Sequence, residues 1–139
     1  MGGRTILVVD DDDEIREIVS LALEVMGGWT VVSADRGLAG LKLAREHRPD
    51  VVLLDVMMPE MDGPTMFSRM QGDPELCHIP VVLLTAKVQV GHVQVWDSLR
   101  VAGVIPKPFN PATLCAEIDH LVAEHRRADV VGAEQPFSA

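Results

Sequence analysis

A short apolar run that ends on a carboxylate lies near the middle of the chain and reads Val51-Val52-Leu53-Leu54-Asp55. Similar short runs rich in β-branched residues occur before and after it, at residues 6–9, 29–32, 81–84 and 103–105. Several of these runs are apolar at every position, which is typical of strands in a parallel sheet whose two faces are both covered by helices. Residues 51–55 are therefore predicted to form a buried strand.

Segments with helical periodicity separate these runs, and their apolar positions recur as in helices that bury one face. The residues that mark these faces are Ile15, Ile18, Val19 and Ala22; Leu38 and Leu41; Met66, Phe67 and Met70; and Leu114, Ile118, Leu121 and Val122. A further helix is predicted over residues 88–99, although Gly91 lowers its helix propensity. The alternation of strands and helices predicts a single-domain α/β fold with an open, five-stranded parallel sheet and right-handed crossovers.

Length and charge narrow the range of functions. The chain has 139 residues, which suits one domain, and 47% of them are hydrophobic, which is enough for a packed core. Its 12 basic and 21 acidic side chains give a formal net charge of −9. A field of that sign repels nucleic-acid backbones, so direct binding of nucleic acid is not expected.

Two features concern the compartment in which the protein works. Cys77 and Cys115 lie far apart without a metal-ligand spacing, and both are expected to be free, buried thiols in a reducing compartment. The first apolar run, residues 6–9, is too short for a signal peptide or a membrane span. The protein is therefore expected to be cytoplasmic and to have no membrane partner.

Polar side chains follow the predicted strands at their carboxyl ends. Ligands of open α/β sheets bind at that edge, so the residues there are candidate site residues. They are Asp10, Asp11, Asp55, Thr85 and Lys107. Three carboxylates, one hydroxyl and one ammonium group at one edge predict a site for a charged ligand.

The acidic residues at the start of the chain divide into two groups. Residues 12–14 precede the first predicted helix and are expected to cap it and to favour its positive end. Asp10 and Asp11 adjoin the strand and should lie near Asp55, where like charges raise pKa values or require a cation. Five scattered histidines show no ligand spacing, so an all-oxygen site that suits Mg²⁺ is the expectation.

Asp55 has two interpretations. It could simply cap a turn or helix, as a single carboxylate at a strand end often does. With a metal at Asp10 and Asp11, it would instead be the carboxylate that attacks phosphorus and forms an aspartyl phosphate. Lys107 would then pair with the carboxylate and the incoming phosphoryl oxygens, and the Thr85 hydroxyl would donate a hydrogen bond to one of those oxygens.

Four ordered motifs carry a family resemblance. They are Val8-Val9-Asp10-Asp11, Leu54-Asp55-Val56-Met57-Met58-Pro59-Glu60-Met61-Asp62-Gly63, Leu84-Thr85-Ala86 and Lys107-Pro108-Phe109. They resemble the signatures of the receiver domain of two-component response regulators. The resemblance covers residues 4–125 and implies a flavodoxin-like sheet of order 2-1-3-4-5 with helices on both faces. Residues 126–139 lack periodicity and are expected to be a flexible tail or the stub of a linker.

The resemblance also implies roles for the site residues. Asp55 would be the phosphoacceptor, Thr85 the switch hydroxyl and Lys107 the lysine that pairs with the phosphate. The implied Mg²⁺ ligands are the side chains of Asp10, Asp11 and Asp55 and the backbone carbonyl of Met57. The bond between Lys107 and Pro108 is one that receivers often hold in the cis form.

Partners follow from the same resemblance. A sensor histidine kinase or a histidine phosphotransfer protein would supply the phosphoryl group, and phosphorylation would change a surface that an unknown downstream protein contacts. Phosphorylation-dependent homodimerisation stays open, as does the choice between a stand-alone protein and a fragment of a longer regulator or kinase. The module would not be an enzyme with a turnover substrate, since it would catalyse only transfer to Asp55 and hydrolysis from it.

One position departs from the family pattern. Receivers often carry Tyr or Phe three residues before the lysine, whereas this chain has Val104. Without a ring to rotate, switching is expected to use other movements, including those of residues 88–99 and Trp96. Met57 and Lys87, two residues after Asp55 and Thr85, resemble positions that tune the lifetime of the phosphoryl group in receivers.

Three other functions fit the sequence less well. A receiver-shaped scaffold that never takes phosphate is the main alternative. A Mg²⁺-dependent phosphatase of the haloacid dehalogenase type is less favoured, because residues 55–57 read Asp-Val-Met and lack its second carboxylate. A flavodoxin would need an anion-binding loop after the first strand, where this chain has four consecutive aspartates.

Overall fold

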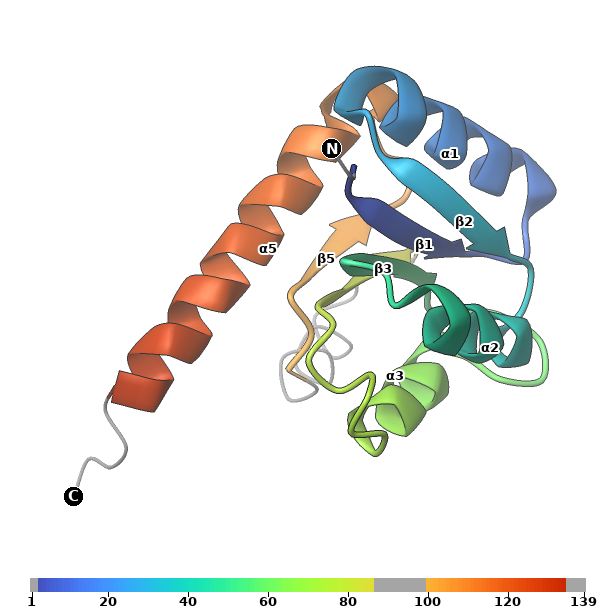
Figure 1. The fold of residues 1–139 in the computed structure, drawn as a ribbon. Helices are drawn as coiled ribbons and strands as arrows, with labels where there is room; N and C mark the ends of the chain where they lie inside the picture. The colour runs from blue at the N-terminus through green and yellow to red at the C-terminus, as the bar shows by residue number, and fades with distance from the viewer. Residues whose placement is uncertain (1–2, 87–99, 135–139) are drawn as a thin grey trace.

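The computed structural model describes residues 3–86 and 100–134, and its elements alternate between strands and helices (Figure 1). The strands are β1 (Thr5–Val9), β2 (Thr30–Ala34), β3 (Val51–Asp55), β4 (Val81–Thr85) and β5 (Gly103–Pro106). The helices are α1 (Asp13–Gly27), α2 (Gly37–His47), α3 (Gly63–Gln71) and α5 (Pro111–Glu134). The helix predicted over residues 88–99, with Trp96, lies outside the described residues, as does Lys87.

The five strands form one parallel sheet of order β2-β1-β3-β4-β5. This order confirms the predicted fold class. All five residues of β3 are buried, since β1 and β4 pair with its two edges and helices cover both faces. The uninterrupted apolar composition of residues 51–54 is therefore explained by burial on both sides.

Alternate residues along each strand enter two separate cores. Leu7 and Val9 of β1 pack with residues of α2 and α3, whereas Ile6 and Val8 pack with residues of α1 and α5. Figure 1 shows the sheet between these two helical layers. The two-residue period of a strand thus supplies both cores from the same run of apolar residues.

Two of the apolar residues that marked the predicted helix faces do not lie in a core. Ile18 of α1 is 47% exposed, and Leu38 of α2 is 57% exposed. The buried face of α1 consists of Val19, Ala22 and Leu23. Residues three or four positions apart share a helix face, so periodicity alone allowed more than one stripe.

Side-chain caps define where two helices begin. Asp12 caps α1 and accepts hydrogen bonds from the backbone N–H groups of Glu14 and Ile15. This confirms the predicted cap for Asp12, while Asp13 and Glu14 lie in the first turn, at the positive end of the helix. Asp62 caps α3 in the same way and accepts from the N–H group of Thr65.

The last helix is longer than expected. α5 continues through Glu134, past the loss of apolar periodicity near Arg126, and its end extends away from the sheet in Figure 1. The backbone of residues 126–134 is thus helical, while the assignment of 126–139 to a tail or linker stays a prediction. In the described parts of the chain, no helix combines the length and the apolar character that crossing a bilayer requires.

The two cysteines differ in their surroundings. Both are free thiols, but Cys77 is exposed and Cys115 is only partly buried, so the expectation that both are buried was wrong. Cys115 lies on α5 facing α1, where its Sγ is 3.7 Å from the Ala22 carbonyl oxygen. Burial is the main cause that raises the pKa of the Cys115 thiol, which keeps it in its neutral form.

Candidate functional site

Three polar side chains are buried at the carboxyl edge of the sheet. Asp10 follows β1 and is fully buried, and Asp55 and Thr85, which end β3 and β4, are 3% and 1% exposed. Because the strands are parallel and adjacent, their last residues meet at one edge. The structure thus brings together residues that lie up to 75 positions apart in the chain, from Asp10 to Thr85.

The loop after β1 holds Asp10 through local hydrogen bonds. Its Oδ1 accepts from the backbone N–H group of Asp12 at 2.9 Å. Arg16, one turn into α1, donates from its guanidinium to the Asp10 carbonyl oxygen at 2.9 Å and also pairs with Asp13 at 2.5 Å. Sequence reasoning missed Arg16, and its position four residues after a helix cap offered no signal of this contact.

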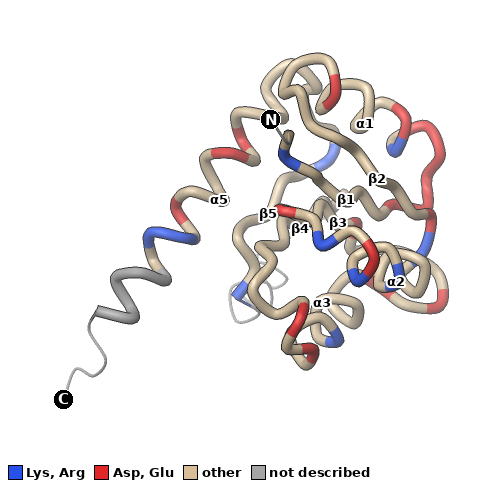
Figure 2. Tube along the Cα trace, in the orientation of Figure 1, with Lys and Arg blue, Asp and Glu red and all other residues tan. Residues whose placement is uncertain are grey.

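Asp10, Asp11 and Asp55 form a cluster of carboxylates, which we call the acidic cluster. One carboxylate oxygen of each residue lies within 4.8 Å of the others, with Asp10 and Asp55 buried and Asp11 exposed. Figure 2 shows acidic residues concentrated where β1 passes into α1. This donor set fits a hard divalent cation, because all its ligands are oxygen atoms and one of the three carboxylates faces solvent.

Lys107 lies between the two buried carboxylates. Its Nζ is 3.1 Å from Asp10 Oδ2 and 3.2 Å from Asp55 Oδ1. Its backbone N–H group donates to the Thr85 carbonyl oxygen at 2.7 Å, which holds the residue just past β5 beside the end of β4. The peptide bond between Lys107 and Pro108 is cis. The predicted pairing of Lys107 with one carboxylate is in fact a pairing with two.

Burial and neighbouring charges change the ionisation of this group of side chains. Burial, followed by the negative charge of Asp10, raises the pKa of Asp55 to about 7, although the Lys107 ammonium opposes that rise. Burial lowers the pKa of Lys107, but its hydrogen bond to Asp10 and the charges of Asp10 and Asp55 outweigh this and raise it. The ammonium thus stays charged, while Asp55 is poised between its two forms near neutral pH.

The remaining predicted residues lie around this centre. Met57, two residues after Asp55, has a side chain that is 60% exposed, and metal coordination by its backbone carbonyl stays a prediction. Val104 is half-buried in β5, where it pairs with Leu83 and packs on the core beneath α2 and α3. The Val104 side chain fills part of the sheet face instead of providing a mobile ring at the surface.

A close backbone contact holds the loop that follows Asp55. Gly63 donates its N–H group to the Val56 carbonyl oxygen at 2.9 Å. A Cβ atom on Gly63 would lie 2.5 Å from the Asp55 carbonyl oxygen and 2.9 Å from the Val56 Cα atom. The Asp62-Gly63 pair suggested only a shaped loop, whereas the structure shows that glycine is needed because α3 starts directly against the backbone of the acidic cluster.

The family and the relatives of the chain agree with this geometry. Residues 6–119 match the family described as response regulator receiver domain. The chain therefore belongs to the receiver domain family of two-component response regulators. Receiver domains interact with histidine kinases or phosphotransfer proteins and are generally not classical enzymes. The haloacid dehalogenase and flavodoxin alternatives are thereby set aside.

Solved receivers share the whole fold. The chain is similar to the chemotaxis response regulator CheY4 of Vibrio cholerae, with a TM-score of 0.80 and 30% identity over 86% of this chain and 99% of that one. It is also similar to the signal receiver domain of a signal transduction histidine kinase from Syntrophus aciditrophicus, with a TM-score of 0.77 and 29% identity over 88% and 92% of the two chains.

Relatives of known name include longer proteins. The chain is 38% identical over 125 residues to RpaA of Synechocystis, a DNA-binding dual master transcriptional regulator. The matched region is 89% of this chain and 50% of RpaA. It is 34% identical to the chemotaxis protein CheY-3 of Vibrio cholerae over 84% of this chain and 89% of that one. The chain thus spans about half the length of the transcriptional regulators it matches. With a DNA-binding relative, the expectation that no nucleic acid is bound has no support.

Proposed function

We propose that this receiver domain accepts a phosphoryl group on Asp55 with Mg²⁺ as its cofactor. A sensor histidine kinase or a histidine phosphotransfer protein would be the donor. Asp10, Asp11 and Asp55, with the Met57 backbone carbonyl, would hold the metal, and Thr85 and Lys107 would bind the oxygens of the phosphoryl group. Phosphorylation would then change a surface that a downstream protein contacts.

One observation supports this proposal more than any other. The Lys107 ammonium lies 3.1 Å and 3.2 Å from two carboxylates that are almost fully buried, and a third carboxylate at the same edge faces solvent. Removing two carboxylates from water beside a third carboxylate, with one ammonium to balance them, is unfavourable unless the site gains a counter-charge on binding a ligand. A divalent cation would balance the excess negative charge and, when bound, would neutralise charge on the transferring phosphoryl oxygens.

The side chains of the chain would act as follows. The phosphoryl group starts on a histidine nitrogen of the donor protein. An Asp55 carboxylate oxygen attacks the phosphorus atom and forms an O–P bond. The P–N bond breaks, and its electron pair remains on the imidazole of the donor histidine. Lys107 moves from Asp55 to an oxygen of the arriving group, and the Thr85 hydroxyl donates to another. No oxidant or reductant is needed, because only the phosphoryl group changes partner.

The first test uses a small phosphoryl donor. With Mg²⁺ and acetyl phosphate, intact-mass spectrometry is expected to show one added phosphoryl group on the wild-type protein and none on Asp55→Asn. The adduct should disappear on treatment with hydroxylamine, which cleaves acyl phosphates. EDTA should prevent its formation because the metal would be removed.

Asp35→Asn is the matched control for this test. Asp35 follows β2 at the same edge of the sheet, but it is exposed and pairs with Arg36 outside the acidic cluster. This variant is expected to be phosphorylated like the wild type. Wild-type protein without an adduct, or an adduct that persists in Asp55→Asn, would contradict the proposal and favour a scaffold that takes no phosphate.

Metal binding is tested separately. Asp11→Asn is expected to weaken Mg²⁺ binding by about tenfold or more, measured by isothermal titration calorimetry, because one of three carboxylate ligands becomes neutral. Asp12→Asn removes the same charge one residue further on but retains a side chain that caps α1 equally well. It should bind Mg²⁺ almost as tightly as the wild type, and equal weakening in both variants would argue against a defined site.

A further inference from the structure

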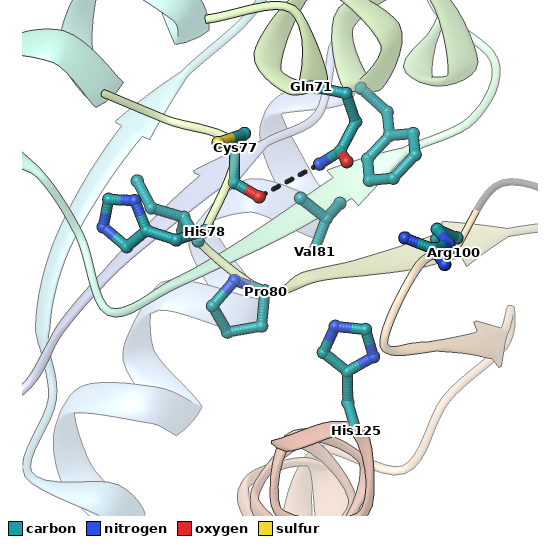
Figure 3. Close-up of a pocket in the computed structure, with 9 residues that line it drawn as sticks. Gln71, Cys77, His78, Pro80, Val81, Arg100 and His125 are labelled. Carbon is teal, nitrogen blue, oxygen red and sulfur yellow. Dashed lines mark hydrogen bonds between the residues drawn. The ribbon is translucent and has the colours of Figure 1, made fainter. Parts of the chain in front are cut away.

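A pocket of about 360 Å³ lies at the end of the sheet opposite to the acidic cluster. It opens between α3, the loop that leads into β4, and α5 (Figure 3). Pro80 and Val81 line it at the start of β4, whereas Thr85 ends the same strand at the other edge. At about 3.3 Å per residue, β4 separates the pocket from the proposed phosphorylation site by roughly 13 Å.

The ionisable nitrogen groups that line the pocket come from three separate segments. His78 belongs to the loop before β4, Arg100 precedes β5, and His125 lies on α5, where its ring points into the pocket in Figure 3. None of the described residues that line the pocket is Asp or Glu. Arg100 forms no ion pair within residues 3–86 and 100–134, although the chain carries a net charge of −9.

The acidic residues of the loop before β4 already have partners. Asp73 lies 3.2 Å from the Arg45 guanidinium, and Glu75 pairs with Arg48. Both arginines belong to α2 or its C-terminal cap, so these carboxylates are neutralised from that side. The guanidinium of Arg100 therefore gives the pocket a positive charge that neither loop carboxylate balances.

The rest of the lining gives the pocket a closed floor and a polar wall. Phe67 and Ile79 are buried beneath the pocket, with 3% and 4% of their surface exposed. Gln71 is oriented by a hydrogen bond from its Nε2 to the Cys77 carbonyl oxygen at 3.3 Å (Figure 3). The volume lies within the range of small-molecule sites, in which apolar walls are combined with a few polar groups.

We infer that this pocket is a second ligand site, which binds a small molecule carrying a carboxylate or phosphate group. The planar guanidinium of Arg100 would bind the oxyanion through two parallel hydrogen bonds, and the imidazole of His125, which points into the same part of the pocket, would contact a remaining oxygen (Figure 3). Phe67 and Ile79, which are almost fully buried, would form the floor of the site. The site is separate from the acidic cluster, so it does not depend on phosphorylation of Asp55.

The backbone of Arg100 allows a clean test. Arg100 has φ 63°, in the left-handed region where most side chains are unfavourable. Asn and Gly adopt this conformation more readily than Arg, so Arg100→Asn removes the guanidinium without imposing a new backbone penalty. Arg100→Gly is a second variant with the same property, in case the amide of Asn itself binds the ligand.

The experiment titrates citrate and inorganic phosphate, in separate arms, into the full chain without Mg²⁺. Chemical shifts of the backbone and of the His78 and His125 imidazoles are followed by NMR, with sodium chloride of equal ionic strength as the blank. We expect saturable shifts at the pocket for at least one oxyanion, with a Kd of about 1 mM or lower. The arm that binds more tightly identifies the carboxylate or the phosphate as the preferred group.

The variants then decide whether the pocket is responsible. Arg100→Asn and Arg100→Gly should each weaken binding by about tenfold or more, because a charge-assisted pair of hydrogen bonds is lost. Arg69→Gln, which removes an exposed charge on α3 outside the pocket, should leave binding unchanged. Shifts confined to the region of Lys107, shifts equal to those in chloride, or equal weakening by Arg69→Gln would each overturn the inference.

Discussion

Gly63→Ala is expected to lower the free energy of unfolding by about 3 kcal/mol, because the added methyl group has no space. Its Cβ would lie 2.5 Å from the Asp55 carbonyl oxygen and 2.9 Å from the Val56 Cα atom, both of which are backbone atoms. Neither can move away as the end of a flexible side chain could, so α3 or the loop after Asp55 must shift. Urea denaturation monitored by circular dichroism measures the change.

The shift should also affect the acidic cluster. Because the clash involves the carbonyl group of Asp55 itself, Gly63→Ala should weaken Mg²⁺ binding as well as stability. Gly72→Ala is the control, since a Cβ there would meet its nearest atoms at 3.7 Å and 3.8 Å and the backbone has an ordinary right-handed conformation. Equal stability of the wild type and Gly63→Ala would show that the backbone at α3 is not tightly held.

Asp55→Asn is expected to stabilise the metal-free protein at alkaline pH by about 2 to 4 kcal/mol. Burial and the charge of Asp10 raise the pKa of Asp55 from 3.8 to about 7, so the folded protein binds this proton more tightly than the unfolded chain does. As pH rises between these two values, the unfolded chain loses the proton first and wild-type stability falls. Lys107 keeps Asp10 as its partner in the variant.

The difference in stability between Asp55→Asn and the wild type depends on pH and on bound metal. Denaturation in EDTA should show the variant more stable than the wild type at about pH 8 and nearly equal to it below about pH 3, where Asp55 is largely protonated in both states. Saturating Mg²⁺ should remove or reverse the difference, because it binds the wild-type carboxylate. A variant that is less stable at about pH 8 without metal would show that the Lys107 pairing outweighs the burial of Asp55.

Much of the fold was predictable because strands that are buried on both faces consist almost entirely of apolar residues. Residues 51–54 and 81–84 are apolar throughout because helices cover both faces of their strands, and the structure places both in the centre of the sheet. Asp10, Asp55 and Thr85 could be placed at one edge for a related reason. Parallel strands direct all their carboxyl ends the same way, so residues that close successive apolar runs must meet.

Other features depended on which surfaces came into contact. Ile18 and Leu38 have the same apolar chemistry as their buried neighbours, but no helix or strand among residues 3–86 and 100–134 covers them. α5 continues past Arg126 because a helix needs no apolar partner in order to form hydrogen bonds along its backbone. Periodicity in a sequence reports what could be buried, not what a neighbouring element does bury.

The order of apolar runs and of the polar residues that close them was enough to predict the parallel sheet, and the motifs at those positions were enough to predict the family and the candidate site residues. These predictions depend only on residue types and their spacing along the chain, and both can be read from the sequence. The contact of Lys107 with two carboxylates, the proximity of Gly63 to the Asp55 backbone, the hydrogen bond from Arg16 and the basic pocket required coordinates. Each depends on distances of a few ångströms between segments far apart in the chain, which only side-chain packing across the sheet determines.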